Sequence, residues 1–370
     1  MRLDFRHIVL AFTAAALLVG GCSRQAIPVT VPDGDDYIEF GVGSIRLERE
    51  TKGVDPSDLE DRTRFDYGDR IMVYGWHYRG DAQLVFEDQE VTLSAKHLAP
   101  EKDEWTYSPK QRWAWTNDDY YDFLAVPEGV TATHSNETPF TLSVHYDPTV
   151  RQYDLLMAGK RHKISDSNPG REVELNFNHM LCAVKVRFHK ASGGEQFIVT
   201  AYHFTDLIAN GDIMGYWNDD EERRRFDSRI ANAQRLQTEQ FGIDRTSAEP
   251  WLIDANFLKT LSDEYDPGFY DLLLPQDLDG DGAPSLVVKF MDHVDDDPDD
   301  LIVQYHEYEP DPVPLKDIKV AGSEDQFITR WEAGHIYIYD VYILFNGGVL
   351  VNVSTSQWED VLAQTPGLMI

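Results

Sequence analysis

Apolar and polar residues alternate along most of the chain in short runs, a pattern typical of half-buried β-strands. The alternation has a period of two, which places neighbouring side chains on opposite faces of a sheet. Residues 140–146 show it most clearly, with an apolar face of Phe140, Leu142, Val144 and Tyr146. Similar runs, separated by turn residues, cover 37–42, 71–76, 84–86, 91–93, 121–126, 173–177, 183–188, 196–202, 285–290, 336–344 and 349–353. The pattern predicts an all-β sandwich fold.

One stretch, residues 218–241, departs from the strand pattern. It is highly charged, contains no proline or glycine, and has scattered apolar residues such as Phe226 and Ile230. We interpret it as a surface helix inserted in the second half of the chain. Its charge run, residues 219–225, is then the solvated face of that helix.

The length of the chain favours two domains. A polar stretch at residues 165–170, Ser-Asp-Ser-Asn-Pro-Gly, is typical of a domain junction. We therefore place an N-terminal β-sandwich at residues 37–175 and a C-terminal β-sandwich at residues 176–370.

The N-terminus carries the signature of an exported lipoprotein. Arg2 and Arg6 precede an apolar run at residues 8–19, which is too short to anchor the chain in a bilayer. Small residues then lead to Cys22. The sequence predicts a signal peptide at residues 1–21, cleavage before Cys22, and acylation of that cysteine. Residues 22–36, rich in proline and aspartate, form a tether to the first strand. An ordinary secretory signal is the alternative.

The counts of charged residues and cysteines limit the partners and the disulfides that the chain can form. The chain has 33 Lys and Arg against 65 Asp and Glu, a net charge of -32. Such a charge repels nucleic acid, which is therefore excluded as a partner. With Cys22 acylated, Cys182 stands alone and forms no internal disulfide. Its apolar neighbours predict a buried, unreactive thiol.

The chain shows no signature of a catalytic site. It contains no Gly-x-Ser-x-Gly elbow, no His-Glu-x-x-His motif and no phosphate loop. We expect a protein that is not an enzyme and needs no cofactor. One motif favours an ion, because Asp277, Asp279 and Asp281 match the beginning of a calcium loop. Val288 stands where a full EF-hand loop has its bidentate glutamate, so a Ca²⁺ site and a simple acidic turn both stay open.

A group of aromatic residues admits two interpretations. Aromatic faces stack on glycans, but aromatic residues on strands more often fill the core, and we favour the core. The group consists of Trp105, Tyr107, Trp113, Trp115, Tyr120 and Tyr121.

Several motifs recur in a fixed order along the mature chain. They are residues 65–75 (FDYGDRIMVYG), 105–107 (WTY), 112–115 (RWAW), 120–125 (YYDFLA), 154–158 (DLLMA), 175–186 (LNFNHMLCAVKV), 272–276 (LLLPQ) and 331–339 (WEAGHIYIY). Together with the lipobox, this order resembles the fimbrillin family, in particular its Mfa-like lipoproteins. The motif at 175–186 is the most specific.

The resemblance implies two transthyretin-like β-sandwich domains and a fimbrial subunit or fimbria-associated adhesin at the outer membrane. In stalk subunits of the family, a protease cuts after a basic residue near the N-terminus and frees a groove. A strand of the next subunit then fills that groove by β-augmentation. The candidate cleavage points are Arg46, Arg49 and Lys52. Residues 349–370 are a candidate donor strand, or else an ordinary final strand and tail.

The resemblance also implies partners: other fimbrial subunits, the outer membrane through the lipid, and a host or bacterial surface glycan or protein. A stalk, a tip and an anchor subunit all fit the sequence. The alternative function is a glycan-binding outer-membrane lipoprotein of a polysaccharide-uptake system, which would need an exposed aromatic platform.

Overall fold

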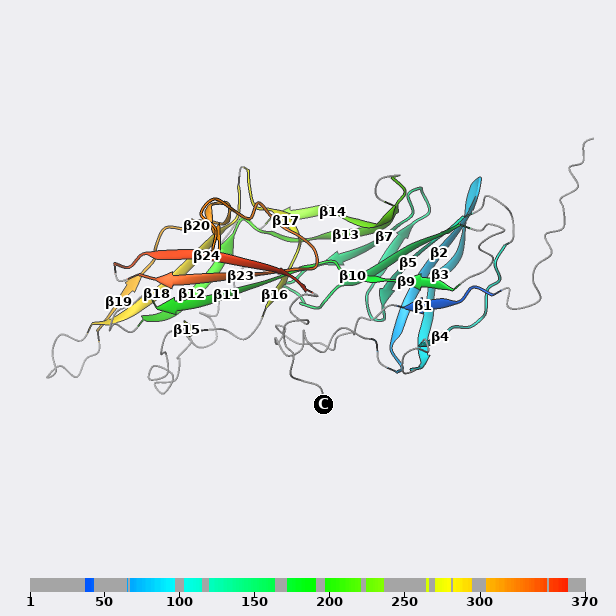
Figure 1. Ribbon diagram of the computed structural model, residues 1–370, viewed down its shortest axis with the longest axis horizontal. Coiled ribbons are helices and arrows are strands. Elements are labelled where there is room, and N and C mark those ends of the chain that lie inside the picture. Colours follow the sequence, from blue (N-terminus) through cyan, green and yellow to red (C-terminus); the bar gives the residue numbers. More distant parts are fainter. Residues whose placement is uncertain are drawn as a thin grey trace, which may run out of the picture.

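The fold is almost entirely β, as the alternation predicts. The computed structural model describes residues 37–42, 65, 67–96, 103–114, 120–163, 172–190, 197–220, 224–235, 264–265, 270–280, 282–294, 304–344 and 346–358. Their strands form an elongated molecule with one group of sheets toward each end (Figure 1). Within these ranges, no helix is both long and apolar enough to cross a membrane.

A six-stranded antiparallel sheet is the centre of the first group. Its order is β10-β8-β5-β2-β3-β4. The strands are β2 (Arg70–Arg79), β3 (Asp81–Ala95), β4 (Glu104–Thr106), β5 (Tyr120–Pro127), β8 (Leu156–Lys163) and β10 (Phe177–His179). β5 is buried along almost its whole length, because both faces of this sheet are covered.

One of these faces packs against a four-stranded sheet of order β14-β13-β7-β6. Its strands are β6 (Ala132–Ser135), β7 (Thr141–Tyr146), β13 (Ile208–Asn218) and β14 (Arg225–Arg235). Trp76 and Met157 of the larger sheet meet Leu142, Val144 and Ile213 of the smaller sheet in one buried cluster. We call this pair of sheets the first sandwich. Two of its strands come from residues beyond 205, so the sandwich combines distant parts of the chain.

The second sandwich also consists of two sheets. One has the order β15-β11-β23-β24-β21 with β16 beside β11, and the other has β12-β18-β19 with β20 beside β18. Their bounds are β11 (Cys182–Lys190), β12 (Phe197–Thr205), β15 (Glu264–Tyr265), β16 (Asp271–Leu273), β18 (Ser285–Val294), β19 (Gln304–Tyr308), β20 (Val313–Pro314), β21 (Lys319–Val320), β23 (His335–Ile343) and β24 (Val349–Gln357). A two-stranded sheet of β17 (Gln276–Asp277) and β22 (Arg330–Trp331) and the 3-10 turn η2 (Leu315–Asp317) complete the described part of this half.

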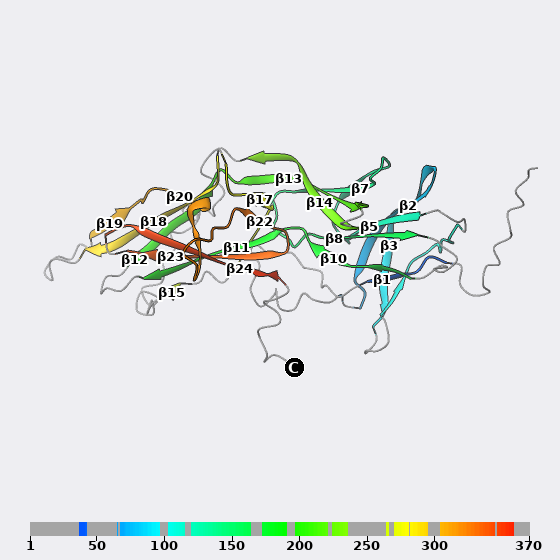
Figure 2. The ribbon, with the colours of Figure 1, turned by 45° about the horizontal axis from the view of Figure 1, so that its top comes forward.

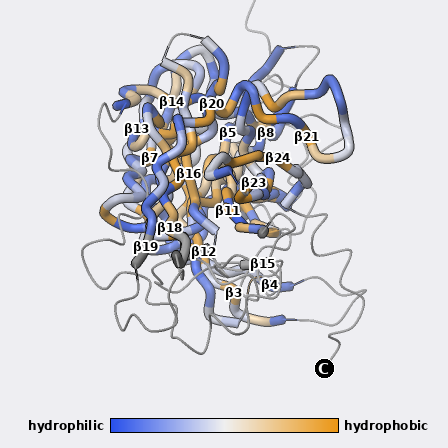
Figure 3. The backbone as a smooth tube through the Cα atoms, turned by 90° about the vertical axis from the view of Figure 1, so that its left-hand side faces the viewer, coloured by the Kyte–Doolittle hydropathy of each residue, from blue (hydrophilic) through white to orange (hydrophobic). Residues whose placement is uncertain are grey.

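The core of the second sandwich follows from the alternation in its strands. Val184 and Val186 of β11 face Phe204 of β12 and Tyr339 of β23 in a buried cluster. Viewed from one end of the molecule, the hydrophobic strand segments gather between the layers (Figure 3). Cys182 belongs to this cluster with 0% exposure, and burial raises the pKa of its thiol well above the usual value. The prediction of a buried, unreactive thiol is confirmed.

The predicted helix at residues 218–241 is wrong where the structure describes it. Residues 225–235 form β14, which pairs antiparallel with β13 from Trp217↔Phe226 to Ile213↔Ile230. Phe226 and Ile230 are four residues apart, a spacing that fits one face of a helix and also one face of a strand. The decisive contact is distant in sequence, because both side chains pack against the core of the first sandwich.

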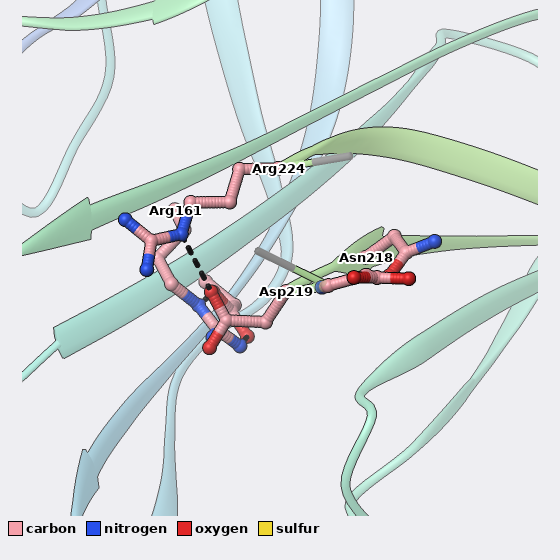
Figure 4. Close-up of polar contacts among 6 residues, drawn as sticks. Arg161, Asn218, Asp219 and Arg224 are labelled. Atoms are coloured by element: carbon pink, nitrogen blue, oxygen red, sulfur yellow. Dashed lines mark hydrogen bonds and ion pairs between the residues drawn. The ribbon is translucent and has the colours of Figure 1, made fainter. Parts of the chain in front are cut away.

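An ion pair links the tip of the β13–β14 hairpin to the large sheet (Figure 4). Arg161 on β8 binds the carboxylate of Asp122 on β5 through Nε and Nη2, both at 2.6 Å. Its Nη1 lies 2.6 Å from Asp219, just after β13, and Arg224 approaches the same carboxylate at 4.0 Å. The Arg161 guanidinium also stacks on Tyr120.

Replacing Arg161 by leucine should lower the free energy of unfolding by about 3 kcal/mol, because the Asp122 carboxylate is left buried without its bidentate partner. The Asp122 side chain is only 3% exposed. The matched control is Arg224→Leu, which removes a long contact at the surface and should cost less than about 0.5 kcal/mol. Urea unfolding of both variants measures the difference, and equal losses would contradict this account.

Candidate functional site

A short N-terminal strand covers the second face of the large sheet. This strand, β1 (Phe40–Val42), pairs in parallel with β9 (Val173–Leu175), from Phe40↔Val173 to Val42↔Leu175. The Val173 amide donates to the Glu39 carbonyl oxygen at 2.7 Å, and the Ile38 amide donates to the Gln111 carbonyl oxygen at 2.9 Å. In the described part of the chain, the backbone around β1 thus has a three-pair ladder with β9 and an isolated antiparallel bridge between Tyr37 and Arg112.

The side chains of β1, in contrast, are deeply inserted. Ile38 is 0% exposed and Phe40 is 2% exposed, while Glu39 between them points to solvent. The Phe40 ring makes edge-to-face contacts with the rings of Phe86, Tyr107 and Phe123, at centroid distances of 5.5, 5.6 and 5.5 Å. Such contacts are favourable beyond the area that they bury.

We call the site that β1 occupies, lined by Phe86, Tyr107 and Phe123, the β1 groove. One polar group of this groove also binds the backbone next to β1. The Tyr107 hydroxyl donates to the Ile38 carbonyl oxygen at 2.7 Å. Burial raises the pKa of Tyr107, so the phenol keeps the proton that it donates. These contacts fit an extended strand with apolar residues at alternate positions and a carbonyl oxygen opposite Tyr107.

The buried aromatic residues near β4 belong to the same hydrophobic cluster as Ile38 and Phe40. Trp105, Tyr107, Trp113 and Tyr121 are between 1% and 7% exposed, so the core interpretation is confirmed for these four. Tyr120 is half-buried and stacks on Tyr78, with 4.9 Å between ring centroids. Trp115 lies outside the described residues. The four buried rings are not accessible to a glycan.

Most of the predicted site residues at the N-terminus lie outside the described residues. These are the acylation site Cys22 and the candidate cleavage points Arg46, Arg49 and Lys52, and they stay predictions. The last residue of β1, Val42, precedes Arg46 by four positions.

The candidate calcium residues are described in part. Asp277 lies on β17, is mostly exposed, and its carboxylate is 3.7 Å from Nε of Arg330. Asp279 is exposed, and Asp281 lies outside the described residues. Arg235 donates from Nη1 to the neighbouring carbonyl oxygen of Gly282. Among the residues that the structure describes, no group of three His, Cys, Asp or Glu side chains is arranged to hold a metal ion. The calcium site stays a prediction.

The candidate donor segment begins as a strand of this chain's own sheet. Residues 349–357 form β24, which pairs with β23 from Ile343↔Val349 to His335↔Gln357. Trp358 follows, is 2% exposed, and stacks on His179 with 4.2 Å between ring centroids. Residues 359–370 lie outside the described part of the chain.

Sequence reasoning located both strands of the site but not their contact. Residues 37–42 and 173–177 each alternate, and each was predicted as a strand. The parallel pairing of β1 with β9 leaves no local signal, because more than 130 positions separate Phe40 from Val173.

A comparison with models of protein families shows to which family the chain belongs. The fimbrillin-like family model matches residues 59–358. The chain belongs to the fimbrillin-like family. This confirms the resemblance drawn from the ordered motifs. The match begins after β1, so the description of the groove rests on the structure alone.

The chain is also similar to solved structures of low sequence identity. One is a fimbrial protein from Bacteroides vulgatus, at 12% identity and a TM-score of 0.48, covering 88% of this chain and 100% of that chain. Another is a fimbrial assembly protein from Parabacteroides distasonis, at 9% identity and a TM-score of 0.39, covering 88% of this chain and 97% of that chain. Comparison with curated protein sequences gives no significant match.

Proposed function

We propose that this fimbrillin-like protein is a fimbrial subunit or fimbria-associated adhesin that assembles by strand exchange at the β1 groove. Membership in the family supports a fimbrial or adhesive role at the cell surface. In this proposal the lipid on Cys22 holds the subunit at the outer membrane until assembly. Its principal partners are other fimbrial subunits.

The observation that carries the proposal is the contrast between the side chains and the backbone of β1. Ile38 and Phe40 fill the buried cluster on the second face of the large sheet, so an empty groove would expose a large apolar surface. The backbone, however, forms a ladder of only three residue pairs with β9. A longer strand with the same alternation would bury the same core and add main-chain hydrogen bonds.

A cut at Arg46, Arg49 or Lys52 would turn β1 into a separate peptide. It would break the only covalent link between β1 and the remainder of the first sandwich. Only noncovalent contacts would then hold β1 in its groove. A strand from another subunit that makes the same contacts would compete with β1 for the groove. We propose this cut as the step that permits assembly.

Limited digestion of the mature protein with a trypsin-like protease tests this step. We expect cleavage within residues 46–52, followed by growth of oligomers in native chromatography, with the cut located by mass spectrometry. The variant Arg46→Ala/Arg49→Ala/Lys52→Ala should stay uncut there and keep the size of the undigested wild type. The matched control Lys316→Ala/Lys319→Ala changes exposed basic residues of the second sandwich and should assemble like the wild type. Cleaved protein that keeps its size would contradict the proposal.

The glycan-binding alternative loses its main support in this structure. It depends on an exposed aromatic platform, and four of the six aromatic residues behind it are buried. We therefore propose the fimbrial role alone.

A further inference from the structure

The first sandwich has an open, basic sheet edge at β14. Within the described part of the chain, β14 pairs with β13 on one side and with no strand on the other. Its regular part covers residues 225–231, and the positive φ of Asn232 accompanies a bulge that ends it. Arg225 and Arg229 are exposed, and their register opposite Asn218 and Met214 places both on the outer face of the sheet.

A second open edge, at β3, is acidic. β3 pairs with β2 from Arg79↔Asp81 to Arg70↔Thr92, but with β4 only at Thr92, Leu93 and Ala95. The stretch from residue 81 to 91 therefore has no described strand on its outer side, and two register shifts and the positive φ of Asp88 divide it into the regular runs 81–84 and 89–91. Asp81, Glu87 and Glu90 are exposed along it, and of these Glu90 lies 3.6 Å from Arg70.

The two edges belong to opposite sides of the same sandwich. β14 packs over β8, where Phe226 lies against Gly159, while β3 is separated from β8 by β5 and β2. Figures 1 and 2 show β14 along the top of the molecule and β3 beyond it near the right-hand end. A contact between the β14 edge of one copy and the β3 edge of the next leaves one edge of each kind free. Contacts of this type are heterologous, so they build a ring or an open filament of copies.

We propose that the β14 edge of one copy binds the β3 edge of a second copy of this chain. Open edges pair through main-chain hydrogen bonds, and charged residues normally prevent indiscriminate pairing. Here the two edges carry opposite charge, so the same residues that reject other strands select this one. The chain has a net charge of -32, so two copies repel one another over most of their surface. Arg225 and Arg229 lie on either side of Asp227 on this face, so the strip has a net positive charge and offsets part of that repulsion.

This contact is distinct from strand exchange, because it requires neither cleavage nor an empty groove. Sedimentation velocity of the uncut mature chain, with Cys22→Ser to prevent acylation, therefore tests it independently. At an ionic strength of about 0.15 M, where the screening length of about 8 Å weakens the repulsion between the two acidic molecules more than it weakens pairs in direct contact, we expect association that grows with concentration. Lowering the ionic strength to about 0.01 M should weaken the association, because the repulsion then acts over about 30 Å.

Charge reversal on either edge makes the test specific. Arg225→Glu/Arg229→Glu and Asp81→Lys/Glu87→Lys should each weaken self-association about tenfold or more, because like charges then meet. Mixing the two variants should restore association, since each then offers the other an edge of opposite charge. The control Lys316→Glu/Lys319→Glu carries the same charge change as the arginine variant on the second sandwich and should associate more strongly than that variant. A wild type that stays monomeric at an ionic strength of about 0.15 M, or a mixture without restored association, would overturn the proposal.

Discussion

Replacing Phe40 by alanine is expected to lower the free energy of unfolding by about 3–5 kcal/mol, a large loss for a residue in a three-residue strand. The ring is 2% exposed and contacts three other aromatic rings of the core. Its removal leaves a cavity that the surrounding sheet cannot close. Urea denaturation followed by tryptophan fluorescence measures the loss, because Trp105 and Trp113 belong to the same cluster.

The control for this substitution is Tyr67→Ala. Tyr67 lies near Phe65 of the same cluster but is 74% exposed, and we expect a change within about 0.5 kcal/mol. A Phe40→Ala variant as stable as this control would mean that β1 does not contribute to the core in solution. The account of the groove would then fail at its first step.

The N-terminal half of the chain, residues 37–175, is expected not to fold when it is expressed alone. It would lack β13 and β14, which supply two of the four strands of the smaller sheet in the first sandwich. Leu142, Val144 and Met157 would lose Ile213 and stay exposed to water. We expect this fragment to give no near-ultraviolet circular dichroism signal and an NMR spectrum with poorly dispersed resonances.

The complementary fragment provides the control for this prediction. Mixing residues 37–175 with residues 176–370 should restore dispersion, because the hairpin of β13 and β14 is then supplied in trans. A fragment 37–175 that folds alone, with cooperative unfolding, would contradict the role given to the hairpin. The predicted division into residues 37–175 and 176–370 would then describe two independent units.

The local pattern of apolar and polar residues predicts many of the strands correctly. It fails where contacts between residues distant in sequence determine the secondary structure. β7 was predictable, because the alternation of Phe140, Leu142, Val144 and Tyr146 matches one buried face and nothing else. β14 was not, because Phe226 and Ile230 have a spacing that suits a helix and a strand equally. The choice between them depends on pairing with β13 and on packing against the large sheet, which no local window of sequence contains.

The same limit applies to the candidate site. The alternation of Ile38, Phe40 and Val42 predicts a strand with one buried face, and the structure agrees. Its parallel pairing with β9 and the contact of Tyr107 with the Ile38 carbonyl oxygen are nonlocal, so the sequence gives no sign of them. The family resemblance implies a cut after β1. The cut would matter because these contacts alone would then hold β1 in place.

A reversible disulfide between β1 and the residue just before β9 tests the central claim most directly. A Cβ at Gly41 would lie 3.3 Å from Cγ of Glu172, the position that the sulfur of a cysteine at 172 would take in the same rotamer, so we choose these two positions for the bridge. The variant Gly41→Cys/Glu172→Cys, with Cys22→Ser, is oxidised, cut with a trypsin-like protease, and examined by native chromatography before and after reduction. The account predicts that the oxidised, cleaved protein keeps the size of the uncut protein and forms larger oligomers once the disulfide is reduced. Oligomers of equal size in both states would show that β1 need not leave its groove for assembly and would contradict the account.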